Sequence, residues 1–266
     1  MKLIDNTNLP AAIAIILLIT TIGCGRIDSE SSSRTEILVS AAASLTDSLY
    51  EIESRYEKDH PDIDIVYNFG SSGALQQQIE QGAPADLFLS AGTKQMRALV
   101  DNQLVDAANQ IGLLRNELVV IVPTDSKNTI DSIGRLAEPE FIKLAIGEPD
   151  TVPAGSYAKE SLERAEVWDR LLPKFVYAKD VRQVLTYVET GNADAGFVYK
   201  TDAMTSKKSR IAFIMDSDSH SPIEYPLGIV KATKHPKEAE SFYAFLQSDD
   251  AHEIFAEYGF GIPSAE

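Results

Sequence analysis

Short apolar runs alternate with amphipathic stretches along almost the whole chain. The short runs are typical of buried strands, whereas the stretches between them repeat their apolar residues at helical spacing. Strands are predicted at 37–40, 63–69, 86–90, 117–122, 143–146, 175–177, 193–198, 211–214 and 227–230, and helices at 45–58, 74–80, 94–100, 158–165, 181–189, 237–247 and 251–258. This alternation predicts an α/β fold with a mostly parallel sheet that is covered by helices on both faces.

The pattern also predicts two lobes. Because no long linker or internal repeat divides the chain, the lobes would have to be joined by two short, extended crossovers, near 114–118 and 222–226. The first lobe would comprise 36–115 and 224–266, and the second 116–223. Ligands of open α/β sheets bind beyond the carboxyl ends of the strands. We therefore expect a binding site in the cleft between the two lobes.

The first 35 residues have a different character. An apolar run at 9–19 follows Lys2, and it is too short to span a bilayer but typical of a secretory signal. Residues 21–24 resemble a bacterial lipobox, which predicts a signal peptide at 1–23, a lipidated Cys24 and a flexible tether at 24–35. The alternative is an ordinary cleaved signal in which Cys24 is incidental. Either way we expect export, to the periplasm or the cell surface, and lipidation would anchor the protein to the membrane.

Composition limits the classes of partner that the protein can bind. The formal net charge of −16 argues against nucleic acid as a partner, because nucleic acids require a basic surface. An acidic protein can still bind an anion where local backbone dipoles face the ligand and the net charge is distant and screened. Cys24 is the only cysteine, so no intrachain disulfide can form. We expect a monomer.

Ser72 lies where a predicted strand gives way to a helix. Small residues surround it in the segment 70–74, so several backbone N–H groups at the positive helix end are unobstructed. Such a junction binds an oxyanion without a charged side chain. The simpler interpretation is that Ser72 only caps its helix, but Ser71 could supply the cap and leave Ser72 for a ligand.

Three further junctions have the same form. Ser44 follows the first strand, and it either caps its helix or donates its N–H and hydroxyl to a ligand. Pro153 has no N–H, so Ala154 and its neighbour Gly155 would offer the first free ones, unless the segment is a plain turn. Asp180 is a natural cap that would leave the N–H groups of Val181 and Arg182 at the helix end.

Tyr199 ends an apolar strand, where its hydroxyl could reach the cleft as a neutral donor or could be satisfied within the core.

Catalytic signatures are missing from the sequence. His60, His220, His235 and His252 do not have the spacing of metal ligands. The segment at 70–73 is not a nucleophile elbow, and no dinucleotide-binding or phosphate-loop motif occurs. We expect neither an enzyme nor a cofactor.

Six segments together resemble the molybdate-binding proteins of bacterial ABC transporters: 41–46, 70–75, 81–91, 152–158, 181–185 and 196–203. The resemblance covers essentially the whole chain after the tether, with the motifs in the family's order. It implies a type II periplasmic-binding-protein fold that captures molybdate or tungstate between its lobes for a membrane permease.

Carried over by motif, the resemblance implies a set of neutral donors. Ser44 and Ser72 would contribute N–H and hydroxyl groups, Ala154 and Val181 would contribute N–H groups, and Tyr199 its hydroxyl. The apparent lipobox departs from the soluble members of the family. Some relatives complete an octahedral metal with carboxylates, a role that Glu148 or Asp150 could take here.

Three alternatives remain open at this stage. The first is a binding protein of the same fold for sulfate or another tetrahedral oxyanion. The second is a secreted serine hydrolase that uses Ser72 or Ser44, for which the sequence offers no convincing base. The third is a ferric-ion binder, which usually needs clustered tyrosine or carboxylate ligands.

Overall fold

The computed structural model of this chain describes residues 34–127 and 129–263. The predicted signal peptide at 1–23, the lipidation site at Cys24 and the tether as far as residue 33 lie outside the described residues. Among the helices that the structure does describe, none is long and apolar enough to cross a membrane.

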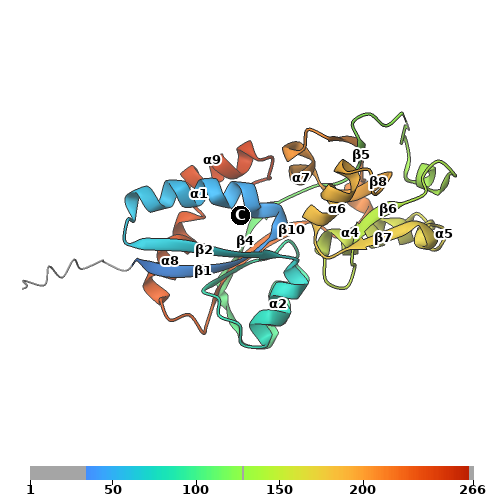
Figure 1. Cartoon of the computed structure of the whole chain (residues 1–266). Helices are drawn as coiled ribbons and strands as arrows, with labels where there is room; N and C mark the ends of the chain where they lie inside the picture. The colour runs from blue at the N-terminus through green and yellow to red at the C-terminus, as the bar shows by residue number, and fades with distance from the viewer. Residues whose placement is uncertain (1–33, 128, 264–266) are drawn as a thin grey trace, which may run out of the picture. The chain divides into compact units, whose positions relative to one another are not determined.

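The first of two five-stranded sheets has the strand order β2-β1-β3-β10-β4 (Figure 1). Its strands are β1 (Thr35–Ala42), β2 (Ile63–Gly70), β3 (Leu87–Leu89), β4 (Val105–Arg115) and β10 (Glu224–Val230). Helices pack on both of its faces, and they are α1 (Thr46–Asp59), α2 (Ser72–Glu80), α3 (Thr93–Asp101), α8 (Pro236–Phe245) and α9 (Asp249–Glu257). We call this part of the molecule the first lobe.

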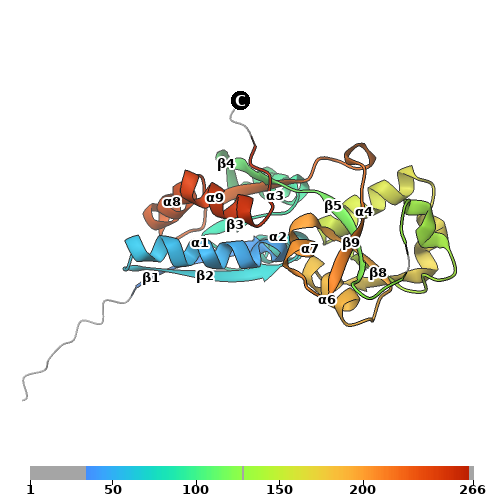
Figure 2. The same ribbon diagram turned by 90° about the horizontal axis from the view of Figure 1, so that it is seen from above.

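Alternation along β3 shows how the two faces of this sheet are buried. Leu87 and Leu89 belong to the core beneath α1, α8 and α9, whereas Phe88 packs with residues of α2 and α3. Successive side chains of a strand point to opposite faces, so the continuous apolar sequence of β3 fills both layers. Figure 2 shows α1 running along β1 and β2, with α8 and α9 beside it.

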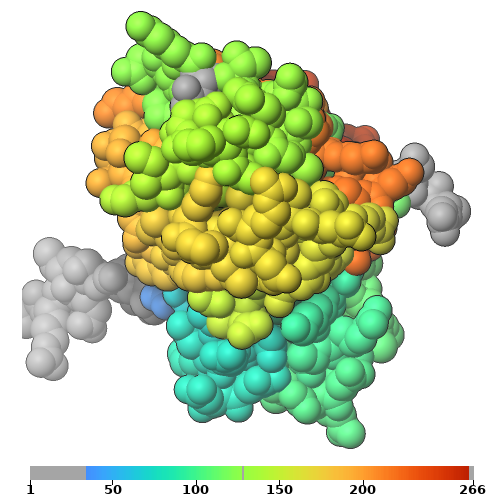
Figure 3. Space-filling view, turned by 90° about the vertical axis from the view of Figure 1, so that its right-hand side faces the viewer, coloured from blue at the N-terminus to red at the C-terminus, as the bar shows by residue number. Residues whose placement is uncertain are grey.

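The second sheet has the order β7-β6-β8-β5-β9. Its strands are β5 (Leu118–Pro123), β6 (Leu144–Gly147), β7 (Phe175–Ala178), β8 (Ala195–Tyr199) and β9 (Ser209–Ile214). Its helices are α4 (Pro153–Arg164), α5 (Trp168–Leu171), α6 (Val181–Glu189) and α7 (Lys200–Thr205), and short 3-10 turns lie at Ala43–Leu45, Ile133–Ala137, Leu172–Lys174 and Ser217–Ser219. We call this part the second lobe, and its green and yellow surface dominates Figure 3.

Two extended crossovers join the sheets where the sequence predicted them. The chain leaves the first sheet after Arg115 and enters the second at Leu118, and it returns to the first sheet at Glu224. Arg115 and Glu224 are opposite one another in the antiparallel pairing of β4 with β10, so the crossovers run close together. The lobe boundaries at 115/116 and 223/224 follow this division but remain predictions.

The prediction of a mostly parallel sheet is wrong. Four strand pairings are parallel and four are antiparallel among the paired strands of the described residues. The antiparallel pairs all involve β5 or β10. Each of these two strands enters its sheet directly from a crossover, so it runs against its neighbours.

Strand β4 and helix α7 were not predicted. Most residues of β4 between Asp106 and Gln110 are exposed, because β4 is an edge strand, so the alternation of apolar residues that marks a buried strand is absent. Helix α7 has only six residues, too few for a helical period to be recognised.

Candidate functional site

All five residues that the sequence predicted as ligand donors line one small cavity between the lobes. The cavity is lined by twelve residues, none of them charged: Ala42, Ala43, Ser44, Gly70, Ser71, Ser72, Ala91, Val152, Pro153, Ala154, Val181 and Tyr199. The cavity is small, and its lining supplies hydroxyl and backbone N–H groups beside apolar side chains. The cavity therefore favours a compact ligand that interacts through hydrogen bonds.

Helix α2 leaves one N–H group of its first turn for a ligand. Ser71 is the cap, and its hydroxyl accepts from the N–H of Ala74 at 3.3 Å, as the sequence suggested. The N–H of Leu75 bonds to the carbonyl of Ser71, and that of Gly73 donates to the carbonyl of Thr151 in the second lobe at 2.9 Å. Within the described part of the chain, the N–H of Ser72 is thus the one in this turn that remains without an acceptor.

The hydroxyl of Ser72 is also available as a donor. Ser72 is fully buried, and its Oγ accepts from the N–H of Ala91 at 2.9 Å. Because that bond occupies a lone pair, the hydroxyl hydrogen of Ser72 remains free to point into the cavity. Ser72 therefore offers two donors from one residue.

Helix α4 presents the N–H of Ala154 in a similar way. Pro153 occupies the first helical position and has no N–H, while the N–H groups of Gly155 and Ser156 both bond to the carbonyl of Val152. Ala154 therefore carries the first unused donor of this helix. Gly155 lies so close to β6 that an added Cβ would come within 2.0 Å of the carbonyl oxygen of Gly147, which fixes the start of the helix against the sheet.

Helix α6 supplies the last of the backbone N–H donors. Asp180 caps it by accepting from the N–H of Gln183 at 2.8 Å, and the N–H of Val184 bonds to the Asp180 carbonyl. The N–H groups of Val181 and Arg182 have no acceptor inside the helix. This arrangement confirms the prediction that Asp180 acts as the cap, and Val181 is the residue that lines the cavity.

Ser44 does not cap a helix, which was the simpler interpretation of its position. No side chain caps helix α1, and the Oγ of Ser44 instead lies 3.0 Å from the hydroxyl oxygen of Tyr225. Both residues are buried, but only Ser44 lines the cavity.

Tyr199 connects the lobes across the cavity. Its hydroxyl donates to the carbonyl of Ala91 over 3.3 Å, so a ligand would have to compete for this long hydrogen bond. Burial, together with Tyr225 and other nearby groups, raises the pKa of Tyr199 well above its usual range. The phenol therefore stays neutral and retains its proton for donation.

A partly buried cluster of charges, with Asp202 fully buried, lies beside the site, and it was not predicted from the sequence. The guanidinium of Arg182 lies 2.7 Å from Asp202 within the second lobe and 2.6 Å from Asp47 on helix α1 of the first lobe. It also donates to the carbonyl of Ser44 over 3.4 Å. These contacts join α6, α7 and α1, so the cluster links the lobes next to the cavity. Local sequence gives no signal for it, because the three residues come from separate elements.

The cluster predicts a pH dependence of stability. Burial raises the pKa of Asp202 to about 6, although Arg182 opposes the rise. Because the pKa is higher in the folded than in the unfolded chain, the stability that this group contributes is complete below about pH 4 and is lost as the pH rises through about 6. Relative to an Asp202→Asn variant, the wild type should lose about 2 kcal/mol of unfolding free energy between pH 4 and 7. Urea titrations at both pH values measure this difference.

Asp47→Asn provides the control for that experiment. The Asp47 side chain is 43% exposed, so water partly screens its interaction with Arg182, and the pH dependence of stability in this variant should stay close to that of the wild type. Parallel curves for the wild type and Asp202→Asn would show that Asp202 is already ionised throughout this range.

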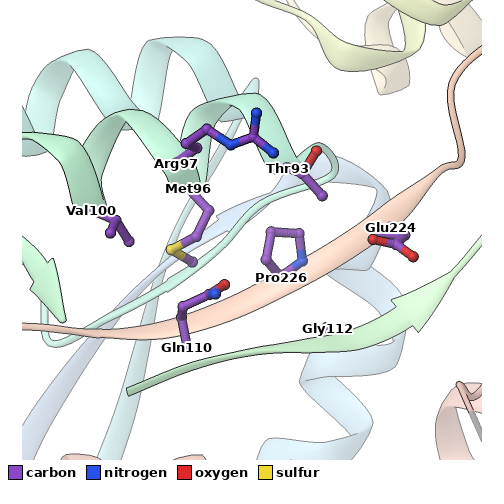
Figure 4. A pocket seen from close by; sticks show the side chains of 8 residues that line it. All are labelled: Thr93, Met96, Arg97, Val100, Gln110, Gly112, Glu224 and Pro226. Atoms are coloured by element: carbon purple, nitrogen blue, oxygen red, sulfur yellow. The ribbon is translucent and has the colours of Figure 1, made fainter. Parts of the chain in front are cut away.

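A larger cavity of about 380 Å³ lies elsewhere, between α3 and the strands β4 and β10 (Figure 4). Its lining combines Arg97 and Glu224 with apolar groups such as Met96 and Pro226, and it contains none of the predicted donors. Neither Glu148 nor Asp150 lines the smaller cavity, so the described residues give no support to carboxylate ligands there.

Comparison with known proteins identifies relatives that match almost the whole chain. Residues 37–261 match the family model of bacterial extracellular solute-binding proteins. The protein named "Putative ABC transporter substrate-binding lipoprotein YvgL" from Bacillus subtilis is 51% identical over 94% of this chain and 95% of its own length. The molybdate-binding protein ModA of Escherichia coli is 42% identical over 85% of this chain and 89% of its own.

A solved structure agrees with these matches. The substrate-binding domain of a protein described as a putative molybdenum ABC transporter from Clostridium difficile is 42% identical, with a TM-score of 0.66. The match covers 86% of this chain and all of that domain.

Proposed function

Because this chain belongs to the family of bacterial extracellular solute-binding proteins, we propose that it captures molybdate, and also tungstate, for an ABC importer. The observation that carries the proposal is the lining of the small cavity, which combines three serines, the N-termini of the three helices α2, α4 and α6, and a tyrosine, without any charged side chain. Relatives that are named as molybdate-binding proteins support the choice of ligand.

The proposed site would discriminate between oxyanions by whether they carry a proton. An oxyanion without protons can accept a hydrogen bond from every donor in the cavity. A protonated phosphate would bring a hydrogen that finds no acceptor, and an unpaired buried group of this kind costs about 1–3 kcal/mol. The negative net charge of the protein does not attract an anion, so the favourable electrostatic potential at the site would come from the helix N-termini.

Size would separate molybdate from sulfate, which is the second candidate ligand. Sulfate also lacks protons at neutral pH, so the donors alone cannot reject it. A smaller ion would leave some of the donors from the two lobes too far away to bond, whereas the larger metal oxyanions would reach both. Tungstate resembles molybdate closely in size, and discrimination between them should be weak.

Transport would follow from the same bridging geometry. A ligand that bonds to both lobes favours the closed arrangement, and a permease can recognise that arrangement. We also propose that Cys24 carries a lipid anchor that keeps the protein at the outer side of the membrane, as the name of the Bacillus subtilis relative suggests for that protein.

Isothermal titration of the chain from residue 25 onward with molybdate, tungstate, sulfate and phosphate tests the proposal. We expect tight binding of the first two ions. Ser72→Ala should weaken molybdate binding about tenfold, because it removes a donor and leaves the N–H of Ala91 without its acceptor.

Ser48→Ala is the matched control, since Ser48 is equally buried in the first lobe but donates to the carbonyl of Leu45. It should bind like the wild type. If the protein binds sulfate tightly but not molybdate, the proposed ligand is wrong, although capture of an oxyanion by neutral donors would still hold. If it binds no oxyanion, the proposal is refuted.

A further inference from the structure

Tyr225 lies directly behind Ser44 and has no access to the cavity or to solvent. It is 0% exposed, and its hydroxyl forms hydrogen bonds with the Oγ of Ser44 at 3.0 Å and with the Nδ2 of Asn116 at 3.1 Å. Distance alone does not decide whether Ser44 or Tyr225 is the donor in their bond. The direction matters, because it determines whether Ser44 presents a hydrogen or only lone pairs to a ligand.

Asn116 decides the direction. Its Oδ1 accepts from the N–H of Glu117 at 2.9 Å, which fixes the orientation of the amide. The Nδ2 group therefore donates, to the hydroxyl of Thr201 at 2.9 Å and to that of Tyr225. An amide NH₂ cannot accept, so Tyr225 is the acceptor in its bond with Asn116.

The hydrogen of Tyr225 must then go to Ser44. Burial raises the pKa of Tyr225 well above its usual range, so the phenol keeps its proton. A buried donor without an acceptor is unfavourable. Tyr199 also lies beside Tyr225, but its hydroxyl is directed to the carbonyl of Ala91, whereas the Oγ of Ser44 lies 3.0 Å from the hydroxyl oxygen of Tyr225, and this geometry favours Ser44 as the acceptor. Once Ser44 accepts this bond, its own hydroxyl hydrogen is free for the cavity, as the hydrogen of Ser72 is.

We propose that Asn116 and Tyr225 are positioning residues that orient the hydroxyl of Ser44 as a donor and so help to reject protonated oxyanions. This inference rests on the proposed function. Asn116 lies on the crossover between the sheets and contacts Thr201 in the second lobe, while Tyr225 and Ser44 belong to the first. We call the series of hydrogen bonds from Asn116 through Tyr225 to Ser44 the relay. It depends on contacts with both lobes.

Tyr225→Phe tests the relay without removing the ring. The freed hydroxyl of Ser44 could then rotate and accept a hydrogen from hydrogen phosphate. We expect molybdate to bind about tenfold more weakly, while phosphate binds as in the wild type or more tightly, so the molybdate-to-phosphate affinity ratio falls about tenfold. A general loosening of the site would instead weaken both ions and leave the ratio unchanged, which would overturn the proposal.

Tyr56→Phe is a close chemical control. Tyr56 is also a buried tyrosine whose hydroxyl bonds to a serine, Ser241, at 2.8 Å, but neither residue lines the cavity. Both affinities should stay at the wild-type values. If Tyr225→Phe does not fold, Asn116→Leu removes the first donor of the relay instead and should produce the same fall in the ratio.

A double variant separates the relay from other effects of Tyr225. In a Ser44→Ala background, Tyr225→Phe should leave the affinity ratio unchanged, because Tyr225 acts only through Ser44. A further fall in that background would overturn the relay. If the wild type binds no oxyanion, the proposed function fails, whereas the relay fails only in a wild type that binds molybdate.

Discussion

Replacing Gly73 by alanine should weaken molybdate binding roughly a hundredfold without destabilising the ligand-free protein. Gly73 lies on α2 of the first lobe, and a Cβ built there would come within 2.6 Å of the carbonyl oxygen and 2.7 Å of the Cα of Thr151 in the second lobe. Backbone atoms cannot move aside as a flexible side chain can. The added methyl would therefore hold the lobes apart where Gly73 now donates to Thr151.

The magnitude follows from the cost of overpacking. Forcing an extra carbon into a packed contact costs about 1–3 kcal/mol, and about 2.7 kcal/mol corresponds to a hundredfold change in affinity. The variant touches none of the proposed donors, so the loss would come from the closed arrangement alone. The proposed transport mechanism requires that the lobes separate when no ligand bridges them, and alanine is the better residue for a helix.

Titration calorimetry and thermal unfolding of Gly73→Ala measure the two effects separately. Gly134→Ala is the control, because nothing lies within 4 Å of a Cβ at Gly134 and its backbone does not have a positive φ. Wild-type affinity in Gly73→Ala would show that ligand binding does not require the close approach of α2 to Thr151.

Features encoded by a few neighbouring residues were predictable from the sequence. Ser71 and Asp180 cap their helices as predicted, and Tyr199 ends its strand. A cap and the residues that it serves lie within one helical turn, so their physical relation is visible in the sequence. The family resemblance then joined these separate junctions into one proposed site.

Long-range contacts could not be predicted in the same way. Ser44 and Tyr225 are 181 residues apart in the chain, and Asn116 is 109 residues from Tyr225. Nothing in the local sequence distinguishes Tyr225 from another strand tyrosine, because its role depends on which strands the fold makes neighbours. The simpler interpretation of Ser44 as a cap was wrong because its hydroxyl bonds to this distant tyrosine and not to its own helix.

Strand direction was the other property that local patterns did not determine. Periodicity identifies a strand and its buried faces, but a parallel and an antiparallel strand can have the same sequence. The direction of β5 and β10 follows from the crossovers that precede them, and the exposed strand β4 carried too weak a pattern to be recognised.

Arg182→Met should lower the free energy of unfolding at neutral pH by about 3–5 kcal/mol. Asp202 is 0% exposed, and Arg182 is the cation beside it, so methionine would leave a buried carboxylate without its partner. Removing one member of a buried ion pair costs far more than the pair contributes, because the remaining charge cannot be solvated. Urea unfolding measures the loss.

Arg55→Met is the matched control for the effect of burial. Arg55 also pairs with an aspartate, Asp250, at 3.0 Å, but both side chains are more than half exposed. Water replaces such a partner at little cost, and the expected change is below about 1 kcal/mol. A loss of similar size in both variants would mean that burial of the ion pair is not the cause of the loss in Arg182→Met.

A double variant identifies the unpaired charge as the cause of the loss. Arg182→Met combined with Asp202→Leu replaces the buried pair by apolar groups, and it should recover most of the stability that Arg182→Met loses. Lowering the pH should also narrow the difference between Arg182→Met and the wild type, because Asp202 without its cation takes up a proton more readily. If the double variant is no more stable than Arg182→Met, the ion pair is not the source of the effect, and the contact of Arg182 with the carbonyl of Ser44 becomes the better explanation.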